Sequence, residues 1–75
     1  LALSGVKMGI LFEEYADQVK ISFRCRRGYR VDELARQFNG GGHLLAAGCK
    51  LPGSLDRALP QVIAAARRLF PDQGC

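Results

Sequence analysis

The sequence predicts a small α/β domain of the α+β type, in which a mostly antiparallel sheet is covered by helices in the order β-β-α-β-α. Two segments near the amino end, 6–12 and 19–25, alternate apolar and polar residues with the period of two that is typical of half-buried strands. Two later segments, 31–38 and 55–69, carry apolar residues at the spacing of amphipathic helices. We find no internal repeat and no linker, and expect residues 1–75 to form a single domain.

The first two strands are expected to pair as an antiparallel hairpin. The apolar positions of the first strand are Val6, Met8, Ile10 and Phe12. Those of the second strand are Val19, Ile21, Phe23 and Cys25. The polar segment from Glu13 to Gln18 is short and suits the connection between two strands with matching apolar faces.

The polar face of the second strand carries a row of cations. Its members are Lys20, Ser22, Arg24 and Arg26, and the row is extended around Gly28 by Arg27 and Arg30. Evenly spaced cations on a rigid sheet can follow a chain of phosphates. A solvated outer face, which is often charged in strands, is the alternative interpretation of the same residues.

The first helix is expected to have Asp32 as its N-cap. Its apolar stripe is Val31, Leu34, Ala35 and Phe38. The glycines that follow should end it. After His43, the segment from Leu44 to Ala47 is expected to form a further helical turn, followed by a strand from Gly48 to Leu51. The glycines would then lie at the amino end of that turn, where free amides and the helix dipole favour an anion.

The last helix is expected to have Ser54 as its N-cap. Its apolar stripe is Leu55, Leu59, Val62, Ala66 and Leu69. Pro60 lacks a backbone N–H, so we expect a kink there, or a short first turn and a fresh start at Pro60. Pro71 should stop the helix and leave Asp72 to Cys75 as a frayed tail.

The most informative stretch is the run FNGGGHLLAAG, from Phe38 to Gly48. Its three glycines, Gly40 to Gly42, allow another molecule to approach the backbone closely, and they end in His43, the single histidine of the chain. Amides and an imidazole that converge in this way suit an anion such as phosphate. Taken alone, the run is at least as typical of a helix C-cap with a surface histidine. We expect the small residues from Ala46 to Gly48 to position the loop by close packing.

Composition narrows the class of protein. The chain has 75 residues and a formal net charge of +4, which is compatible with nucleic acid or phosphate partners and equally with solubility alone. Its three cysteines, Cys25, Cys49 and Cys75, lack metal-site spacing, so we expect free thiols in a reducing, cytoplasmic location, with Cys25 and Cys49 as small core residues. No apolar stretch approaches the roughly 20 residues of a membrane span. Because the chain begins with Leu1, we expect a piece of a longer protein.

The run from Phe38 to Gly48 resembles the glycine-rich GGGHxxAAG signature of the C-terminal, DHH-associated domain of DHH-family phosphoesterases. That family includes oligoribonuclease/phosphoadenosine-phosphate phosphatases and RecJ-like single-strand exonucleases. The segment from Val19 to Arg26, VKISFRCR, is similar to the VKVSFRSR-like strand of the first group, with Cys25 in place of the usual small hydroxyl residue. Asn39 stands where the family often has a further glycine, and Asn tolerates the same left-handed backbone.

The resemblance implies that this chain binds substrate for a metal-dependent hydrolase. Substrate phosphates would be held by Gly40, Gly41, Gly42, His43, Arg24 and Arg26, and His43 would also assist catalysis. An N-terminal DHH catalytic domain of the same protein would hold manganese or magnesium. We expect neither metal nor other cofactor in these residues, whose seven acids are scattered. The implied partners are short single-stranded nucleic acid or nucleotide phosphates and that catalytic domain, with no membrane; a homodimer is left open.

Two other functions stay open on the sequence. Alanyl-tRNA synthetases carry a related C-terminal domain that binds RNA, so a non-catalytic nucleic-acid-binding module is the first alternative. Those domains tend to depart from the histidine-containing signature, whereas His43 is present here. A structural or dimerisation domain is the second alternative, and it predicts no loss of binding when His43 is replaced by alanine.

Overall fold

The computed structural model describes residues 8–26 and 29–70 of the chain. Its elements are β1 (Met8–Glu14), β2 (Gln18–Cys25), α1 (Val31–Arg36), β3 (Gly41–Gly42), β4 (Ala46–Pro52) and α2 (Leu55–Leu69). The expected α+β class and the order β-β-α-β-α are confirmed, with β3 as a short additional strand inside the glycine run. The predictions for Val6, Arg27, Gly28 and the segment from Pro71 to Cys75 lie outside the described residues.

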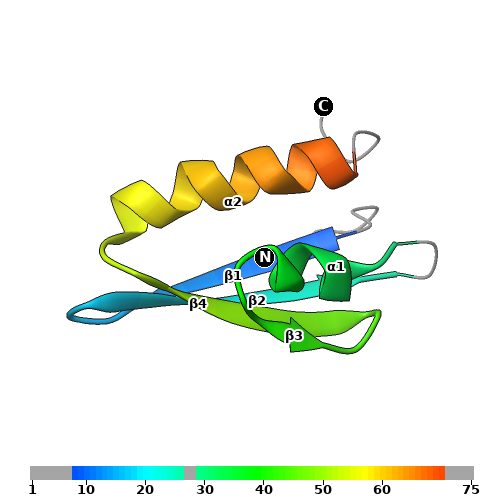
Figure 1. Ribbon diagram of the computed structural model, residues 1–75, viewed down its shortest axis with the longest axis horizontal. Helices are drawn as coiled ribbons and strands as arrows, with labels where there is room; N and C mark the ends of the chain where they lie inside the picture. The colour runs from blue at the N-terminus through cyan, green and yellow to red at the C-terminus, as the bar shows by residue number, and fades with distance from the viewer. Residues whose placement is uncertain (1–7, 27–28, 71–75) are drawn as a thin grey trace.

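The four strands form one antiparallel sheet in the order β1-β2-β4-β3. Helix α1 packs against β2, β3 and β4, and α2 packs against β1 and β2, so both helices lie on the same side of the sheet (Figure 1). The apolar side chains of β2 are fully buried beneath them, as expected: Val19, Ile21 and Phe23. No described element covers the opposite face, where strand alternation places Lys20, Ser22 and Arg24.

The hairpin between β1 and β2 is tighter than expected. Glu13 and Glu14 belong to β1 and Gln18 belongs to β2. The Tyr15 N–H donates a hydrogen bond to the carbonyl oxygen of Gln18 at 2.8 Å. The expected connection from Glu13 to Gln18 is therefore too long at both ends, because polar residues do not interrupt a strand whose outer face meets solvent.

Helix α1 has Arg30 as its N-cap, so the prediction of Asp32 in that role is wrong. Asp32 lies inside the first turn and is only 4% exposed. It stays there because the guanidinium groups of Arg30 and Arg36 reach its carboxylate, at 3.1 and 2.9 Å. The expected apolar stripe is buried at Val31, Leu34 and Ala35. Phe38 packs against the same core from the turn that follows the helix.

Helix α2 runs without interruption from Leu55 to Leu69, so the fresh start expected at Pro60 is wrong. Pro60 is exposed and removes one backbone donor, while the inner face of the helix remains attached to the sheet. The buried residues of that face are Ala58, Val62, Ala65 and Ala66. Leu59 was expected in the stripe but is 42% exposed, because the buried face passes through Ala58 instead.

The amino end of α2 is capped from outside the helix. Ser54 is the N-cap residue, as expected, but its side chain makes no capping hydrogen bond. The Leu55 N–H instead donates to Oε2 of Glu14 at 2.8 Å, which joins α2 to the end of β1. Neither helix described by the structure has the length and apolar character needed to cross a membrane.

Candidate phosphate-binding site

The glycine run and His43 form the edge of the sheet and the turn that follows it. Strands β3 and β4 pair with Gly41 opposite Gly48 and Gly42 opposite Ala47. The His43 N–H donates to the carbonyl oxygen of Ala46 at 2.8 Å, and the Ala46 N–H donates back to His43 at 3.3 Å. His43 and Ala46 therefore close a two-residue hairpin turn, with Leu44 and Leu45 at its tip.

The helical turn expected from Leu44 to Ala47 is wrong. The carbonyl oxygen of Leu44 accepts a hydrogen bond from the Val31 N–H at 2.9 Å, and that of Leu45 accepts one from the Cys25 N–H at 3.0 Å. These bonds to the start of α1 and the end of β2 hold the segment in a hairpin. The glycine run consequently does not lead into a helical turn at residues 44–47, and a phosphate would be held by side chains and by the sheet edge.

Close packing explains two of the three glycines. A side chain at Gly40 would collide with the carbonyl oxygen of Gly48 in β4. Gly42 has a φ of 147°, and a Cβ at this position would lie 2.6 Å from the Cα of Ala47. Gly41 is different, because a Cβ there would meet nothing within 4 Å and the residue is exposed. The bare backbone at Gly41 therefore leaves open space on the surface of the sheet.

The strand ladder determines which amides of the run are available. The Gly40 N–H already donates to a carbonyl oxygen of α1 at 2.9 Å. Hydrogen-bonded and non-hydrogen-bonded pairs alternate along an antiparallel ladder, and His43 with Ala46 is a hydrogen-bonded pair. Gly41 is then bonded to β4, whereas the N–H of Gly42 points outward from the sheet edge. Of the predicted amides, the ladder leaves that of Gly42 for a ligand.

Arg24 and His43 belong to one row across the sheet. Arg24 lies opposite Ala46 in the pairing of β2 with β4, and Ala46 lies opposite His43 in the hairpin. Directly opposite residues project from the same face, so Arg24 and His43 stand on the uncovered face with the methyl group of Ala46 between them. Their strands are separated by β4 and hence lie roughly 10 Å apart.

The neighbouring row has almost no side chains where it crosses β2, β4 and β3. It consists there of Ser22, Gly48 and Gly41, and it continues on β1 with the exposed Leu11. We call the surface formed by Ser22, Gly48 and Gly41 together with Arg24, Ala46 and His43 the trough. Gly48 is itself required by the sheet, because a Cβ there would lie 2.9 Å from the carbonyl oxygen of Ile21. A low floor between a guanidinium and an imidazole is a suitable shape and charge for an oxyanion.

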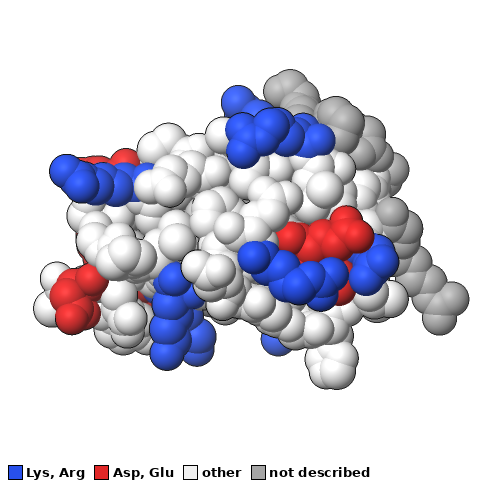
Figure 2. Space-filling model, viewed as in Figure 1, with Lys and Arg blue, Asp and Glu red and all other residues white. Residues whose placement is uncertain are grey.

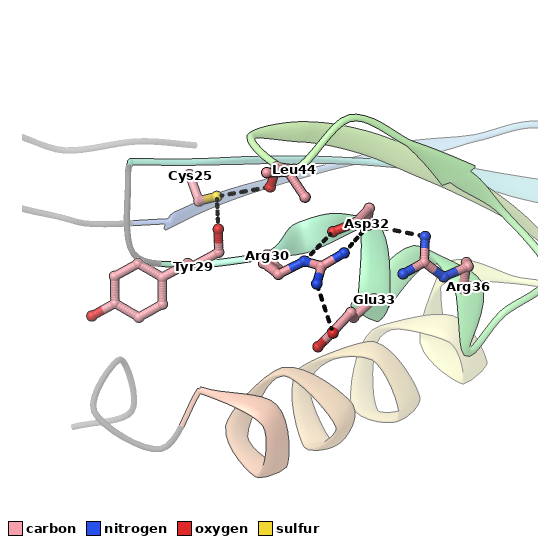
Figure 3. A network of polar contacts seen from close by, with 7 residues as sticks. All are labelled: Cys25, Tyr29, Arg30, Asp32, Glu33, Arg36 and Leu44. Carbon is pink, nitrogen blue, oxygen red and sulfur yellow. Dashed lines mark hydrogen bonds and ion pairs between the residues drawn. The ribbon is translucent and has the colours of Figure 1, made fainter.

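The predicted cations differ in their availability. Arg24 and Arg26 are exposed, Arg26 just beyond the end of β2, and none of the ion pairs within residues 8–26 and 29–70 involves either of them. Arg30, which was expected to extend the basic row, instead pairs with Asp32 at 3.1 Å and with Glu33 at 3.5 Å (Figure 3). Acidic and basic side chains accordingly lie side by side over α1 in Figure 2. Arg30 is therefore part of the scaffold.

Asp32 stabilises the segment that supports the hairpin turn. A hydrogen bond from Arg30, followed by one from Arg36, holds the pKa of Asp32 below its ordinary value, although burial acts in the opposite direction. The same contact with Asp32 raises the pKa of Arg30. Because the neighbouring Val31 N–H donates to Leu44, the ionised carboxylate fixes the part of α1 to which the turn is attached.

Cys25 has a role that sequence reasoning missed. Its thiol lies within hydrogen-bonding distance of two carbonyl oxygens, that of Leu44 at 3.4 Å and that of Tyr29 at 3.5 Å (Figure 3). Burial raises the pKa of the Cys25 thiol, although the backbone N–H of Val31 acts in the opposite direction, and the charge of Asp32 adds to the increase, so the group stays protonated and donates. Cys49, by contrast, is the small core residue that was expected, at 6% exposure. The signal that could have revealed this role is the resemblance to a VKVSFRSR-like strand, in which a serine, also a donor, stands where this chain has Cys25.

No metal ligands were expected among the residues of this chain. Within the described ranges 8–26 and 29–70, no three side chains of His, Cys, Asp or Glu come together in a way that could hold a metal ion. The residues of the trough offer a guanidinium, an imidazole, a hydroxyl, the methyl group of Ala46 and backbone groups. This set suits an anion and does not fit manganese or magnesium, which prefer oxygen ligands.

Sequence comparisons find a matching family and similar proteins. Residues 2–71 match the DHHA1 domain family. A bifunctional oligoribonuclease and PAP phosphatase NrnA from Bacillus subtilis is 41% identical over 49 residues, which cover 65% of this chain and 15% of that protein. The protein of the same name from Thermus thermophilus is 35% identical over 66 residues, or 87% of this chain and 20% of that protein. The chain thus spans no more than about a fifth of the length of these relatives.

Proposed function

Because this chain belongs to the DHHA1 domain family, we propose that it is the substrate-binding domain of a DHH-family phosphoesterase. The substrates would be short single-stranded oligonucleotides or nucleotide phosphates. Two similar proteins are named as both oligoribonuclease and PAP phosphatase. Both names denote small substrates that carry phosphate groups, and the trough has the charge and shape for such a group.

The observation that carries the proposal is the row formed by Arg24, Ala46 and His43 on the uncovered sheet face. This row brings together residues that lie far apart in the sequence. In the neighbouring row, Gly41 exposes its backbone although a side chain at this position would meet nothing within 4 Å. A phosphate between Arg24 and His43 would gain a charge-assisted hydrogen bond on one side and an imidazole donor on the other. The outward N–H of Gly42 lies at the same edge.

Each group would have a distinct role. Arg24 and Arg26 neutralise phosphate charge, and the guanidinium fork fixes the orientation of the phosphate. His43 donates a hydrogen bond from its imidazole to a phosphate oxygen. The hairpin turn keeps that imidazole in place because its backbone is bonded to α1 and β2.

The hydrolytic step belongs to another part of the protein in this proposal. Manganese or magnesium, held by an N-terminal catalytic domain, would supply a nucleophile and stabilise charge on the reacting phosphate. The described residues offer no ligand set for such ions. Closure of that domain over the trough would place the substrate that this chain holds against the catalytic site. The free thiols of Cys25 and Cys49 fit the cytoplasm as the location.

An amide NMR titration of the chain tests the proposal. Phosphoadenosine phosphate and then a short oligoribonucleotide are added at low salt, where phosphate contacts are strongest. We expect shifts concentrated at Gly41 to His43 and at Arg24 and Arg26, and weaker binding by His43→Ala. The matched control is Arg57→Gln on α2, a change at an exposed site away from the trough. No shifts at these residues, or an unchanged affinity in His43→Ala, would overturn the proposal.

A further inference from the structure

A hollow of about 540 Å³ opens beside β4, at the end away from the hairpin turn. The turn after α1, residues 37–40, forms one wall, and the adjoining parts of β2 and β4 form the other. Its lining includes the apolar residues Ile21, Phe38, Cys49 and Leu51 together with two cations, Lys20 and Lys50. Volumes of this size are typical of pockets for small ligands. The trough and the hollow share Gly48, so they are continuous along β4.

The two lysines make an unfavourable pair in the free protein. Lys20 lies directly opposite Lys50 in the pairing of β2 with β4, and both are exposed. Like charges in this position destabilise a sheet. Glu13 lies opposite Lys20 on the other side, yet none of the ion pairs in the described part of the chain involves these three residues. In Figure 2, basic side chains project from the side of the sheet away from α2.

The backbone of β4 adds a donor at the same place. Strand β3 pairs with β4 only at Gly48 and Ala47. Lys50 lies two residues beyond Gly48, so its N–H and carbonyl point to the same side, where no strand of the described structure pairs with them. Two ammonium groups and an outward N–H are thus available for one oxyanion, which would also relieve the repulsion between the lysines.

We infer that the hollow is a subsite for a second nucleotide of a single-stranded chain. Its phosphate binds between Lys20 and Lys50, and its base lies on the apolar side formed by Phe38. The inference rests on the proposed function, in which a first phosphate occupies the trough. Ala46 and Lys50 are four residues apart on β4, or roughly 13 Å. A chain of linked nucleotides reaches both places, whereas a nucleotide with a single sugar occupies the trough alone.

The test compares a triribonucleotide with 3′-phosphoadenosine 5′-phosphate, by titration of each into the chain at several salt concentrations. In the double variant Lys20→Gln/Lys50→Gln we expect about tenfold weaker binding of the triribonucleotide, as for a lost charged contact. The logarithm of the binding constant decreases with the logarithm of the salt concentration, and the magnitude of this negative slope should become smaller by about 0.7, the value for one phosphate of a single strand. Binding of 3′-phosphoadenosine 5′-phosphate should remain unchanged. The control Arg57→Gln/Arg67→Gln removes the same charge from α2 and should affect neither ligand.

The outcomes separate the two proposals. If the lysine variant binds the triribonucleotide as tightly as the original chain, or loses affinity for both ligands equally, the second subsite is overturned while the trough stands. If His43→Ala and Arg24→Gln leave the binding of both ligands unchanged, the proposed function itself is overturned. All six exchanged residues are exposed, and a far-ultraviolet circular dichroism spectrum checks that each variant folds.

Discussion

The thiol of Cys25 lies 3.4 Å from the carbonyl oxygen of Leu44, so the end of β2 is tied to the tip of the turn that carries His43. The Cys25 N–H makes a second tie, to Leu45 at 3.0 Å. The position of the imidazole therefore depends on a residue that stands between the two arginines proposed to bind phosphate. This relation joins the basic strand and the glycine run, which are separate in the sequence, into one structure.

Replacement of Cys25 tests this tie. We expect Cys25→Ala to lower the free energy of unfolding by about 1 kcal/mol, the typical worth of a hydrogen bond, and Cys25→Ser to retain most of it because a hydroxyl also donates. Urea unfolding followed by circular dichroism measures both. Equal stability of the alanine and serine variants would show that the thiol contributes only by packing.

Asp32 should make the stability of the chain depend on acid pH. Its folded-state pKa lies below the ordinary value, mainly because of the hydrogen bond from Arg30. The ionised carboxylate therefore contributes stability that is fully present above the unfolded-state pKa of about 3.9, and that is lost as the pH falls through the folded-state pKa. Thermal unfolding between pH 2 and 7 should show this loss, and Asp32→Asn should be less stable at neutral pH with a flatter acid dependence.

The control for this experiment is Asp17→Asn. Asp17 is exposed and takes part in none of the ion pairs of the described residues. Its variant should keep the acid dependence of the original chain. A profile for Asp32→Asn that matches that of the original chain at every pH would contradict the role given to the Arg30 and Arg36 contacts.

Replacement by alanine should affect two neighbouring glycines differently, with a loss of stability at Gly42 and a loss of binding at Gly41. Gly42→Ala should destabilise the fold by about 1–3 kcal/mol, because a side chain there is strained at a φ of 147° and meets Ala47. Gly41→Ala should change stability by less than about 0.5 kcal/mol, as at an open surface site. It should nevertheless weaken the binding of phosphoadenosine phosphate by placing a methyl group on the floor of the trough. Thermal unfolding and titration of both variants separate the effects, and unaltered binding by Gly41→Ala would argue against the trough.

The cap of α2 provides a matched pair of surface variants. Glu14→Ala should cost about 1 kcal/mol, as for the loss of an N-cap acceptor, because Oε2 of Glu14 accepts the Leu55 N–H. Ser54→Ala should cost much less, since the Ser54 side chain makes no capping bond. Chemical unfolding of the two variants measures the loss in the free energy of unfolding that each change causes. A larger loss in Ser54→Ala would mean that the serine caps the helix in solution.

The sequence alone was sufficient for the fold class and for the buried faces of its regular elements. The alternation at Val19, Ile21 and Phe23 and the stripe at Val31 and Leu34 are local patterns, and each of these residues is fully buried as predicted. The resemblance to the DHH-associated domain was also present in the sequence, because glycines and a histidine at fixed spacing are a local signature. The binding roles of Gly40 to His43, Arg24 and Arg26 remain predictions.

Capping, strand register and ion pairing depend on contacts between residues that are distant in the sequence, so only the tertiary structure decided them. The sequence pattern predicts Asp32 as an N-cap, but in the structure its carboxylate pairs with Arg30 and Arg36 inside the first turn of α1. The segment after His43 forms a hairpin instead of the expected helical turn because its carbonyl groups bond to β2 and α1. The same contacts bring Arg24 and His43 into one row and remove Arg30 from the basic surface. Periodicity reports which side of an element is apolar, whereas register, capping and ion pairing depend on which elements become neighbours.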